Sequence, residues 1–81
     1  MFRRSAPRVT FTQTDRDECT LFIEPWGTEL PLRRGCAIVV ESAAFLTGDV
    51  EVSHCDDGVV VGFTKDVGVR LLDQDGNTLA L

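Results

Sequence analysis

The stretch that decides the fold is Val50–Leu81, VEVSHCDDGVVVGFTKDVGVRLLDQDGNTLAL. Apolar residues alternate with polar or small ones through several runs, and Asp-Gly pairs interrupt them at Asp57-Gly58 and Asp75-Gly76. A period of two sends successive side chains to opposite faces of an extended chain, which indicates β-strands with one buried face. Asp-Gly favours tight hairpin turns because glycine accepts a positive φ. The stretch therefore predicts strands that fold back as hairpins, with Val50, Val52 and His54 in one buried row.

The residues before this stretch continue the β pattern. Val9, Phe11 and Gln13 alternate with threonines, and residues 19–24 alternate in the same way. The charged residues 15–18 between the two runs indicate a turn, so we expect these strands to pair as a hairpin.

The middle of the chain contains a break and an apolar run. Pro25-Trp26-Gly27 ends the second strand, and Pro31 makes residues 28–32 an edge strand, because proline cannot donate to a β-ladder. The run Cys36–Glu41 predicts a central strand covered on both faces. Residues 42–47 are too few for a stable helix and are expected to form a loop or a single turn.

These patterns predict an all-β protein, a single small barrel or sandwich of seven to eight mainly antiparallel strands with hairpin connections. With 81 residues in the chain, one β domain is expected at residues 9–81. Residues 1–8 contain three arginines and no acid, and we expect a disordered basic tail there.

The composition argues against several classes of function. Thirteen acidic residues against eight basic ones give a formal net charge of −5, and an acidic body repels phosphate backbones, so no nucleic-acid partner is expected. The apolar runs fall short of the roughly 18 residues that a bilayer span needs, so no membrane is expected either. Three cysteines without CxxC spacing indicate a reducing, cytoplasmic setting.

Two clusters invite a metal-site interpretation. His54-Cys55-Asp56-Asp57 holds four potential ligands, but neighbours on a strand point to opposite faces, so a site would need Cys19 or Cys36 from another strand. The run Asp73–Asn77 is similar in composition to a calcium loop, but its glycine is fourth rather than sixth, which favours a hairpin turn. No metal and no cofactor are expected.

Catalytic residues are not predicted. The chain has one histidine, one lysine and no tyrosine, and it lacks nucleophile-elbow glycines and a phosphate loop, so a non-enzymatic protein is expected. Trp26, in its turn, either caps an open end of the β core or stacks on a ligand. The possible ligand or partner contacts are Trp26, His54, Cys55, Leu79 and Leu81.

One pattern resembles a known group. Glu24-Pro25-Trp26-Gly27, Leu30-Pro31-Leu32, Gly35 and the run Ala37–Val40 resemble a pattern in small uncharacterised bacterial β proteins. The resemblance implies a bacterial cytosolic setting and transfers no functional residue.

Two functional hypotheses follow. The first is a protein-binding or assembly module that presents an edge strand, the first or the last, or an acidic face to a protein partner or to another copy of itself. The alternative is a small-molecule or metal-binding β barrel that uses Trp26 and the His54 region, which requires a concave pocket joining the two.

Overall fold

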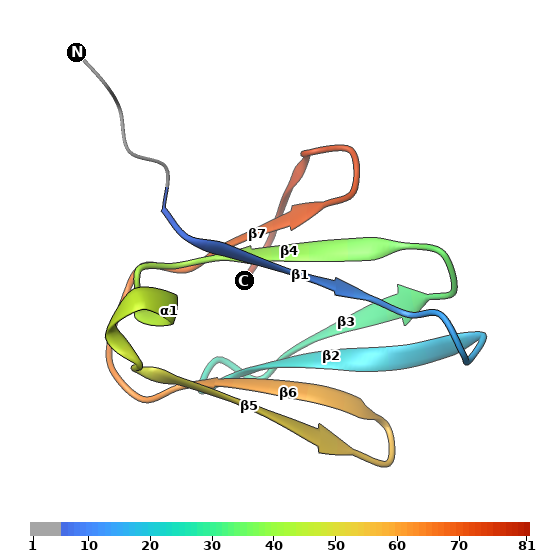
Figure 1. The fold of residues 1–81 in the computed structure, drawn as a ribbon, viewed down its shortest axis with the longest axis horizontal. Coiled ribbons are helices and arrows are strands. Elements are labelled where there is room, and N and C mark those ends of the chain that lie inside the picture. Colours follow the sequence, from blue (N-terminus) through green and yellow to red (C-terminus); the bar gives the residue numbers. More distant parts are fainter. Residues whose placement is uncertain (1–5) are drawn as a thin grey trace.

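A computed structural model describes residues 6–81 of the chain. Within this range eight strands form two four-stranded sheets packed face to face (Figure 1). The prediction of an all-β fold is confirmed, and the arrangement is a sandwich. The strand order is β1-β4-β7-β8 in the first sheet, here sheet 1, and β3-β2-β6-β5 in the second, sheet 2.

The strands are short. Sheet 1 contains β1 (Arg8–Thr12), β4 (Ala37–Glu41), β7 (Arg70–Asp73) and β8 (Thr78–Leu79). Sheet 2 contains β2 (Glu18–Glu24), β3 (Thr28–Arg33), β5 (Val50–Cys55) and β6 (Gly58–Phe63). Neighbouring strands are antiparallel except for β2 and β6, which run parallel.

The core lies between the inner faces of the two sheets. The alternation read from the sequence places every second side chain there, and the contiguous core cluster consists of Cys19, Leu21, Ile23, Leu32, Ile38, Val40, Ala44, Val61, Phe63 and Leu71. Leu72, which pairs with the outward-facing Val39, is buried as well. Removing this apolar surface from water is the main favourable term in folding. The core draws most of its large side chains from β2 and β6 of sheet 2 and from β4 and β7 of sheet 1.

The predicted hairpin between the first two strands is wrong. β1 pairs with β4 in sheet 1, whereas β2 pairs with β3 and β6 in sheet 2. The charged residues between β1 and β2 therefore cross from one sheet to the other. Alternation shows which side chains of a strand point to the core. Strands of both sheets turn their apolar face to the same core, so the pattern does not show to which sheet a strand belongs.

The stretch Val50–Leu81 forms hairpins over part of its length. Hairpins connect the antiparallel pairs β5–β6 and β7–β8, as predicted. The first turns at Asp56-Asp57, directly before Gly58 begins β6, and the second turns through Asp75-Gly76. The chain then departs from the prediction after Phe63, where it crosses to sheet 1. Val67 and Val69 pack against the core from this connection, and strand β7 begins only at Arg70.

β3, which contains Pro31, is an edge strand, as predicted. β4 lies between β1 and β7, and its inward residues Ile38 and Val40 are buried; on its outward face Glu41 is buried and Val39 is half-buried. The segment expected to form a loop or a single turn contains the one-turn helix α1 (Ala44–Thr47), which ends at Gly48 with φ 81°.

The predicted basic tail falls largely outside the described residues, which begin at Ala6. Its last residue, Arg8, begins β1 and makes an ion pair with Glu41 of β4 at 2.6 Å. No helix in the described range is long and apolar enough to cross a membrane.

Candidate functional site

The two sheets each end in an edge strand on the same side of the sandwich. β1 is the edge of sheet 1 and β5 is the edge of sheet 2, and in Figure 1 both run in the same direction along the side that faces the viewer. Among residues 6–81, strand pairing joins β1 only to β4 and β5 only to β6. This open side is the candidate functional site.

The inner face of β5 is not covered by sheet 1. Val50, Val52 and His54 pair with Phe63, Val61 and Val59 of β6, and directly paired residues point to the same face. Phe63 and Val61 are buried in the core, so the β5 residues point inward as well. Val52 is nevertheless 49% exposed, and His54 is exposed.

The predicted buried row is therefore wrong beyond Val50, which is half-buried. Periodicity correctly identified the face to which Val52 and His54 belong. Burial also requires another layer on top, and sheet 1 ends at β1 before it covers β5.

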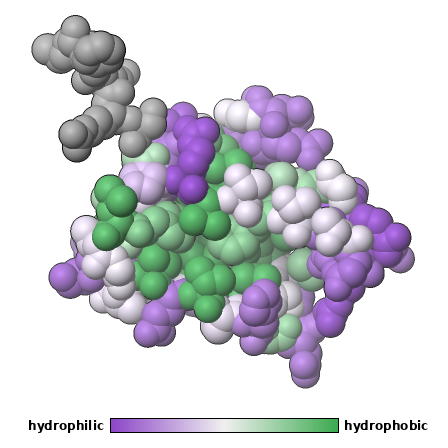
Figure 2. All heavy atoms as spheres, viewed as in Figure 1, coloured by the Kyte–Doolittle hydropathy of each residue, from purple (hydrophilic) through white to green (hydrophobic). Residues whose placement is uncertain are grey.

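Between β1 and the β5–β6 hairpin lies a cleft of about 550 Å³. Phe11, Cys19, Leu32 and Val59 contribute its apolar lining. Threonines of β1, His54 and Cys55 also line it. Figure 2 shows apolar residues gathered on this face of the molecule, over the region that Figure 1 shows between β1 and β6.

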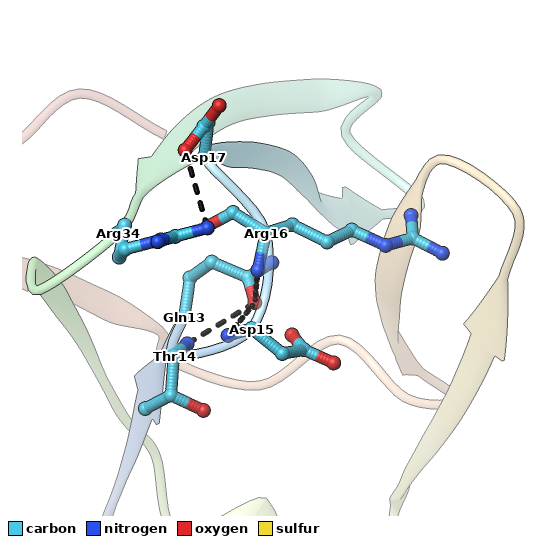
Figure 3. Close-up of polar contacts among 6 residues, drawn as sticks. All are labelled: Gln13, Thr14, Asp15, Arg16, Asp17 and Arg34. Carbon is cyan, nitrogen blue, oxygen red and sulfur yellow. Dashed lines mark hydrogen bonds and ion pairs between the residues drawn. The ribbon is translucent and has the colours of Figure 1, made fainter.

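One end of the cleft is closed by residues 14–17, the connection between β1 and β2, and Gln13 organises this connection. The Gln13 side chain is buried, and its Oε1 accepts the backbone N–H groups of Thr14, Asp15 and Arg16 at 3.1, 3.3 and 3.3 Å (Figure 3). One amide oxygen thus holds three consecutive backbone donors of the turn.

Two arginines tie the same loop to its neighbours. The Arg16 guanidinium donates from Nη1 to the Asp56 carbonyl at 2.8 Å, which bridges the loop to the β5–β6 turn. Arg34 donates from Nε to the Arg16 carbonyl at 3.2 Å and makes an ion pair with Asp17 at 3.2 Å (Figure 3). These contacts fix this end of the cleft to the β5–β6 turn and to the connection between β3 and β4.

Several carboxylates lie close together near the β5–β6 turn. A shallow hollow of about 400 Å³ near the β5–β6 turn is lined by four carboxylate residues, Glu18, Glu29, Asp56 and Asp57, together with Arg16, Cys19, Thr20 and Phe22. It adjoins the closed end of the cleft, since Arg16 and Cys19 line both.

His54 and Cys55 both line the cleft, at the end near Arg16. Cys55 is paired with Gly58, one step along β5 from the His54–Val59 pair, so the two side chains point to opposite faces. Within the described residues, no three His, Cys, Asp or Glu side chains converge in a way that could hold a metal ion. All three cysteines are free thiols.

Trp26 lies away from this cleft. Its ring packs edge-on against Phe63, with centroids 5.7 Å apart, and Phe63 in turn packs against Phe45 of α1. Trp26 covers this end of the core on one side and is 40% exposed on the other. Phe63 and Val59 occupy opposite ends of β6, so Trp26 and His54 do not share a site.

Leu79 and Leu81 lie near the other edge of sheet 1. Leu79, in β8, is half-buried and packs against the core, whereas Leu81 follows the strand and is 44% exposed. The expectation of a last strand at an edge is confirmed, but only two residues of it pair with β7.

The Asp73–Asn77 segment folds as a hairpin turn. The Asp73 carboxylate accepts the backbone N–H groups of Asp75 and Asn77, both at 2.9 Å, and the Asn77 side-chain amide at 3.2 Å. The Asn77 N–H is the main reason that the pKa of Asp73 lies below its ordinary value, because it stabilises the charged form.

The lining of the cleft went partly unrecognised in the sequence. His54 and Cys55 were singled out, but Phe11, Gln13 and Val59 were not. Gln13 did carry a signal, since it is in phase with Val9 and Phe11 and is a polar residue at a position expected to be buried.

The chain was compared with protein-family models, with curated proteins and with solved structures, and none of the three comparisons found a match.

Proposed function

We propose that this protein is a non-enzymatic interaction module that accepts an extended segment of another chain at the free edge of β1. A strand added to β1 would extend sheet 1 over the inner face of β5 and cover Val52 and His54. The exposure of Val52 on an inward-pointing position carries the proposal, because an apolar side chain in that place is normally covered by the opposite sheet.

A comparison of the four edge strands supports β1 as the receiving edge. Natural sheets protect their edges with proline, charged residues or very short strands. β3 has Pro31 with Glu29 and Arg33, β8 has two residues, and β5 has Glu51. β1 has threonines at its outward positions and one charge, Arg8, at its start. Threonine favours strand pairing, so β1 is the edge with the least protection.

The alternative, a ligand-binding barrel built on Trp26 and His54, receives no such support. That hypothesis needs one pocket joining both residues, and Trp26 is absent from the residues that line the cleft at His54. A cytoplasmic setting belongs to the proposal as well, and the three free cysteines support it, because reducing compartments keep thiols free.

The test is a titration of the ¹⁵N-labelled protein with a short synthetic peptide that alternates valine and threonine. We expect saturable amide shifts in β1 and in the β5 residues around Val52. A peptide of the same composition, with its valines and threonines in two blocks, is the control. Equal binding of the two peptides, or shifts confined to other strands, would contradict strand addition at β1.

Two substitutions on β5 locate the binding face. Val52→Lys places a charge on the inner face, where the added strand would lie, and should weaken binding of the alternating peptide about tenfold, equivalent to about 1.4 kcal/mol. Ser53→Lys adds the same charge to the outer face of the same strand and should leave the affinity unchanged. If the Ser53 variant loses as much affinity as the Val52 variant, the outer face is involved instead.

A further inference from the structure

We propose that the segment taken up at β1 belongs to a basic partner and carries a lysine or arginine just N-terminal to its alternating apolar residues, placed against residues 14–17. The inference rests on the proposed function, since it names the chemistry of the segment that binds at the same edge. It follows from the distribution of charge along this edge, which is negative at the closed end of the cleft and positive where β1 begins.

Carboxylates gather around the closed end of the cleft. Asp15 lines the cleft itself, and Glu18, Asp56 and Asp57 line the hollow that adjoins it. All four residues are exposed, and none of them belongs to an ion pair within residues 6–81. Carboxylates held close together without a counter-charge produce a negative field that attracts cations. This end of the cleft therefore favours a positively charged group on the incoming segment.

Arg16 does not neutralise this end. It supplies the one lysine or arginine side chain among the residues that line the cleft and the hollow, against five carboxylate residues, Glu29 included. Its Nη1 donates to the Asp56 backbone carbonyl at 2.8 Å and not to a carboxylate. Figure 3 shows the Asp15 and Arg16 side chains extending to the same side of the loop. The net charge there stays negative, and a second cation is accommodated.

The opposite end of β1 has the opposite sign of charge. Arg8 begins the strand, and its side chain is 54% exposed. Its partner Glu41 is buried and also pairs with Arg70 of β7 at 3.6 Å, so two guanidinium groups share one carboxylate. A segment with its cation at the closed end of the cleft, and none beside Arg8, is the complementary occupant.

The position of the cation follows from strand direction and side-chain period. Every pair within sheet 1 is antiparallel, and antiparallel addition to β1 places the N-terminal end of the incoming segment at the closed end. Apolar residues opposite Val9 and Phe11 point inward, over β5. The preceding residue of the same phase then lies opposite Gln13, whose side chain holds the loop that contains Asp15. A lysine or arginine at that position has its charge next to the carboxylates.

The test compares peptides that differ only in the position and sign of one charge. The reference peptide alternates valine and threonine, begins and ends with valine, and is acetylated and amidated. In three variants the first valine becomes lysine, the first becomes glutamate, or the last becomes lysine. Amide shifts of the ¹⁵N-labelled full chain measure each affinity. We expect lysine in the first position to bind about fivefold tighter than the reference, glutamate there to bind more weakly, and lysine in the last position to give no gain.

Two substitutions in the protein locate the charge that is recognised. Asp15→Asn should reduce the advantage of the first-position lysine about twofold. Asp66→Asn is the matched control, because Asp66 is equally exposed but lies in the connection from β6 to β7, and it should leave the advantage unchanged. In salt of about 1 M, where the Debye length is about 3 Å, the advantage should disappear while the reference peptide still binds.

The outcomes separate this inference from the proposed function. Equal affinities of all the peptides overturn the inference and keep strand addition at β1. An equal gain from lysine in either position, or an equal effect of Asp15→Asn and Asp66→Asn, shows only attraction to an acidic protein and also overturns it. Tighter binding of the last-position lysine overturns the antiparallel placement of the cation. If no peptide binds, the proposed function fails and this inference fails with it.

Discussion

At the scale of single residues, Gly58 lies where β6 passes close to β2. It begins β6 opposite Thr20 of the parallel strand, with φ 154°, and the Thr20 N–H donates to the Asp57 carbonyl at 2.8 Å. A Cβ on Gly58 would lie 1.9 Å from the Thr20 carbonyl oxygen. The sequence indicates only that Gly58 belongs to a turn. In the fold, the absence of a side chain at Gly58 also allows the backbone of β2 to come close.

We therefore expect Gly58→Ala to lower the free energy of unfolding by at least about 3 kcal/mol, because the β2–β6 pairing must shift to relieve the overlap. Gly76→Ala is the control: its φ is 85°, but a Cβ there meets no atom within 4 Å. That change should cost only about 1 kcal/mol of backbone strain. Urea unfolding measures both values, and equal losses would show that the close approach is not what destabilises the Gly58 variant.

Asp73 predicts a pH dependence. The N–H of Asn77, followed by further donors in the hairpin, holds the pKa of Asp73 below its ordinary value of 3.8. A carboxyl whose pKa is lower in the folded state stabilises the fold above its unfolded pKa, and the benefit is lost as the pH falls through the folded value.

Asp73→Asn should therefore destabilise the protein at neutral pH, and the difference from the wild type should shrink as the pH falls below about 4. Asp75→Asn, in the same hairpin, removes a carboxylate while leaving the acceptor at Asp73 in place, and serves as the control. Thermal unfolding at a series of pH values measures the difference. A difference that stays constant down to pH 2 would show that charge at Asp73 is not involved.

At the scale of elements, the connection from β1 to β2 depends on a side chain that belongs to neither strand. Gln13 Oε1 accepts three backbone N–H groups, and the Gln13 carbonyl accepts the N–H of Gly35 at 3.0 Å. The loop is thus held from within, and Arg16 and Arg34 then fasten it to neighbouring turns. This element turns the chain from sheet 1 to sheet 2 and closes one end of the cleft.

Gln13→Ala should lower the free energy of unfolding by about 2 kcal/mol, because three backbone donors lose their acceptor at a partly buried position. It should also speed hydrogen exchange at Thr14, Asp15 and Arg16. Gln74→Ala is the matched change, since that exposed side chain accepts one N–H, from Ala37, at 3.3 Å. Its cost should stay below about 1 kcal/mol. A Gln74 variant as unstable as the Gln13 variant would contradict the account of the loop.

Most elements could be predicted from local signals. Alternation locates the strands, Asp-Gly locates two hairpin turns, and Pro31 identifies an edge, because each of these effects acts within a few residues. The predictions that failed concern which strands pair and where the chain crosses between sheets. Charged residues 15–18 indicate a turn but do not show whether the chain returns to the same sheet, and Val67 and Val69 alternate without forming a strand because they lie on a crossing between sheets.

At the scale of the whole molecule, the two sheets are offset so that one edge of the sandwich stays open. Burial decreases across the inner face of sheet 2, from Leu21 in β2, at 0% exposed, to Val52 in β5, at 49%. The offset, and not the sequence of β5, makes Val52 accessible and creates the cleft beside it. The proposed strand addition acts on this open edge.

The candidate site was predictable only in part for the same reason. The side-chain chemistry of His54 and Cys55 made them candidates from the sequence, and both line the cleft. The sequence pattern indicates only that Phe11 and Val59 belong to strands. They line the cleft because of the distance between β1 and the β5–β6 hairpin, which the sequence does not show. Trp26 and His54, both chosen for their side chains, turned out to lie at opposite ends of β6.

The sequence by itself determined the fold class, most of the strand positions, the two Asp-Gly hairpins and the face of each strand that points inward, because a period of two and the chemistry of turns are local properties. Only the tertiary structure decided which strands pair, where the chain crosses between sheets and which inward faces are covered. Those outcomes depend on contacts between residues far apart in the chain. For this reason Val52 and His54 point to the inner face, as the sequence pattern predicts, but remain exposed because sheet 1 does not cover them.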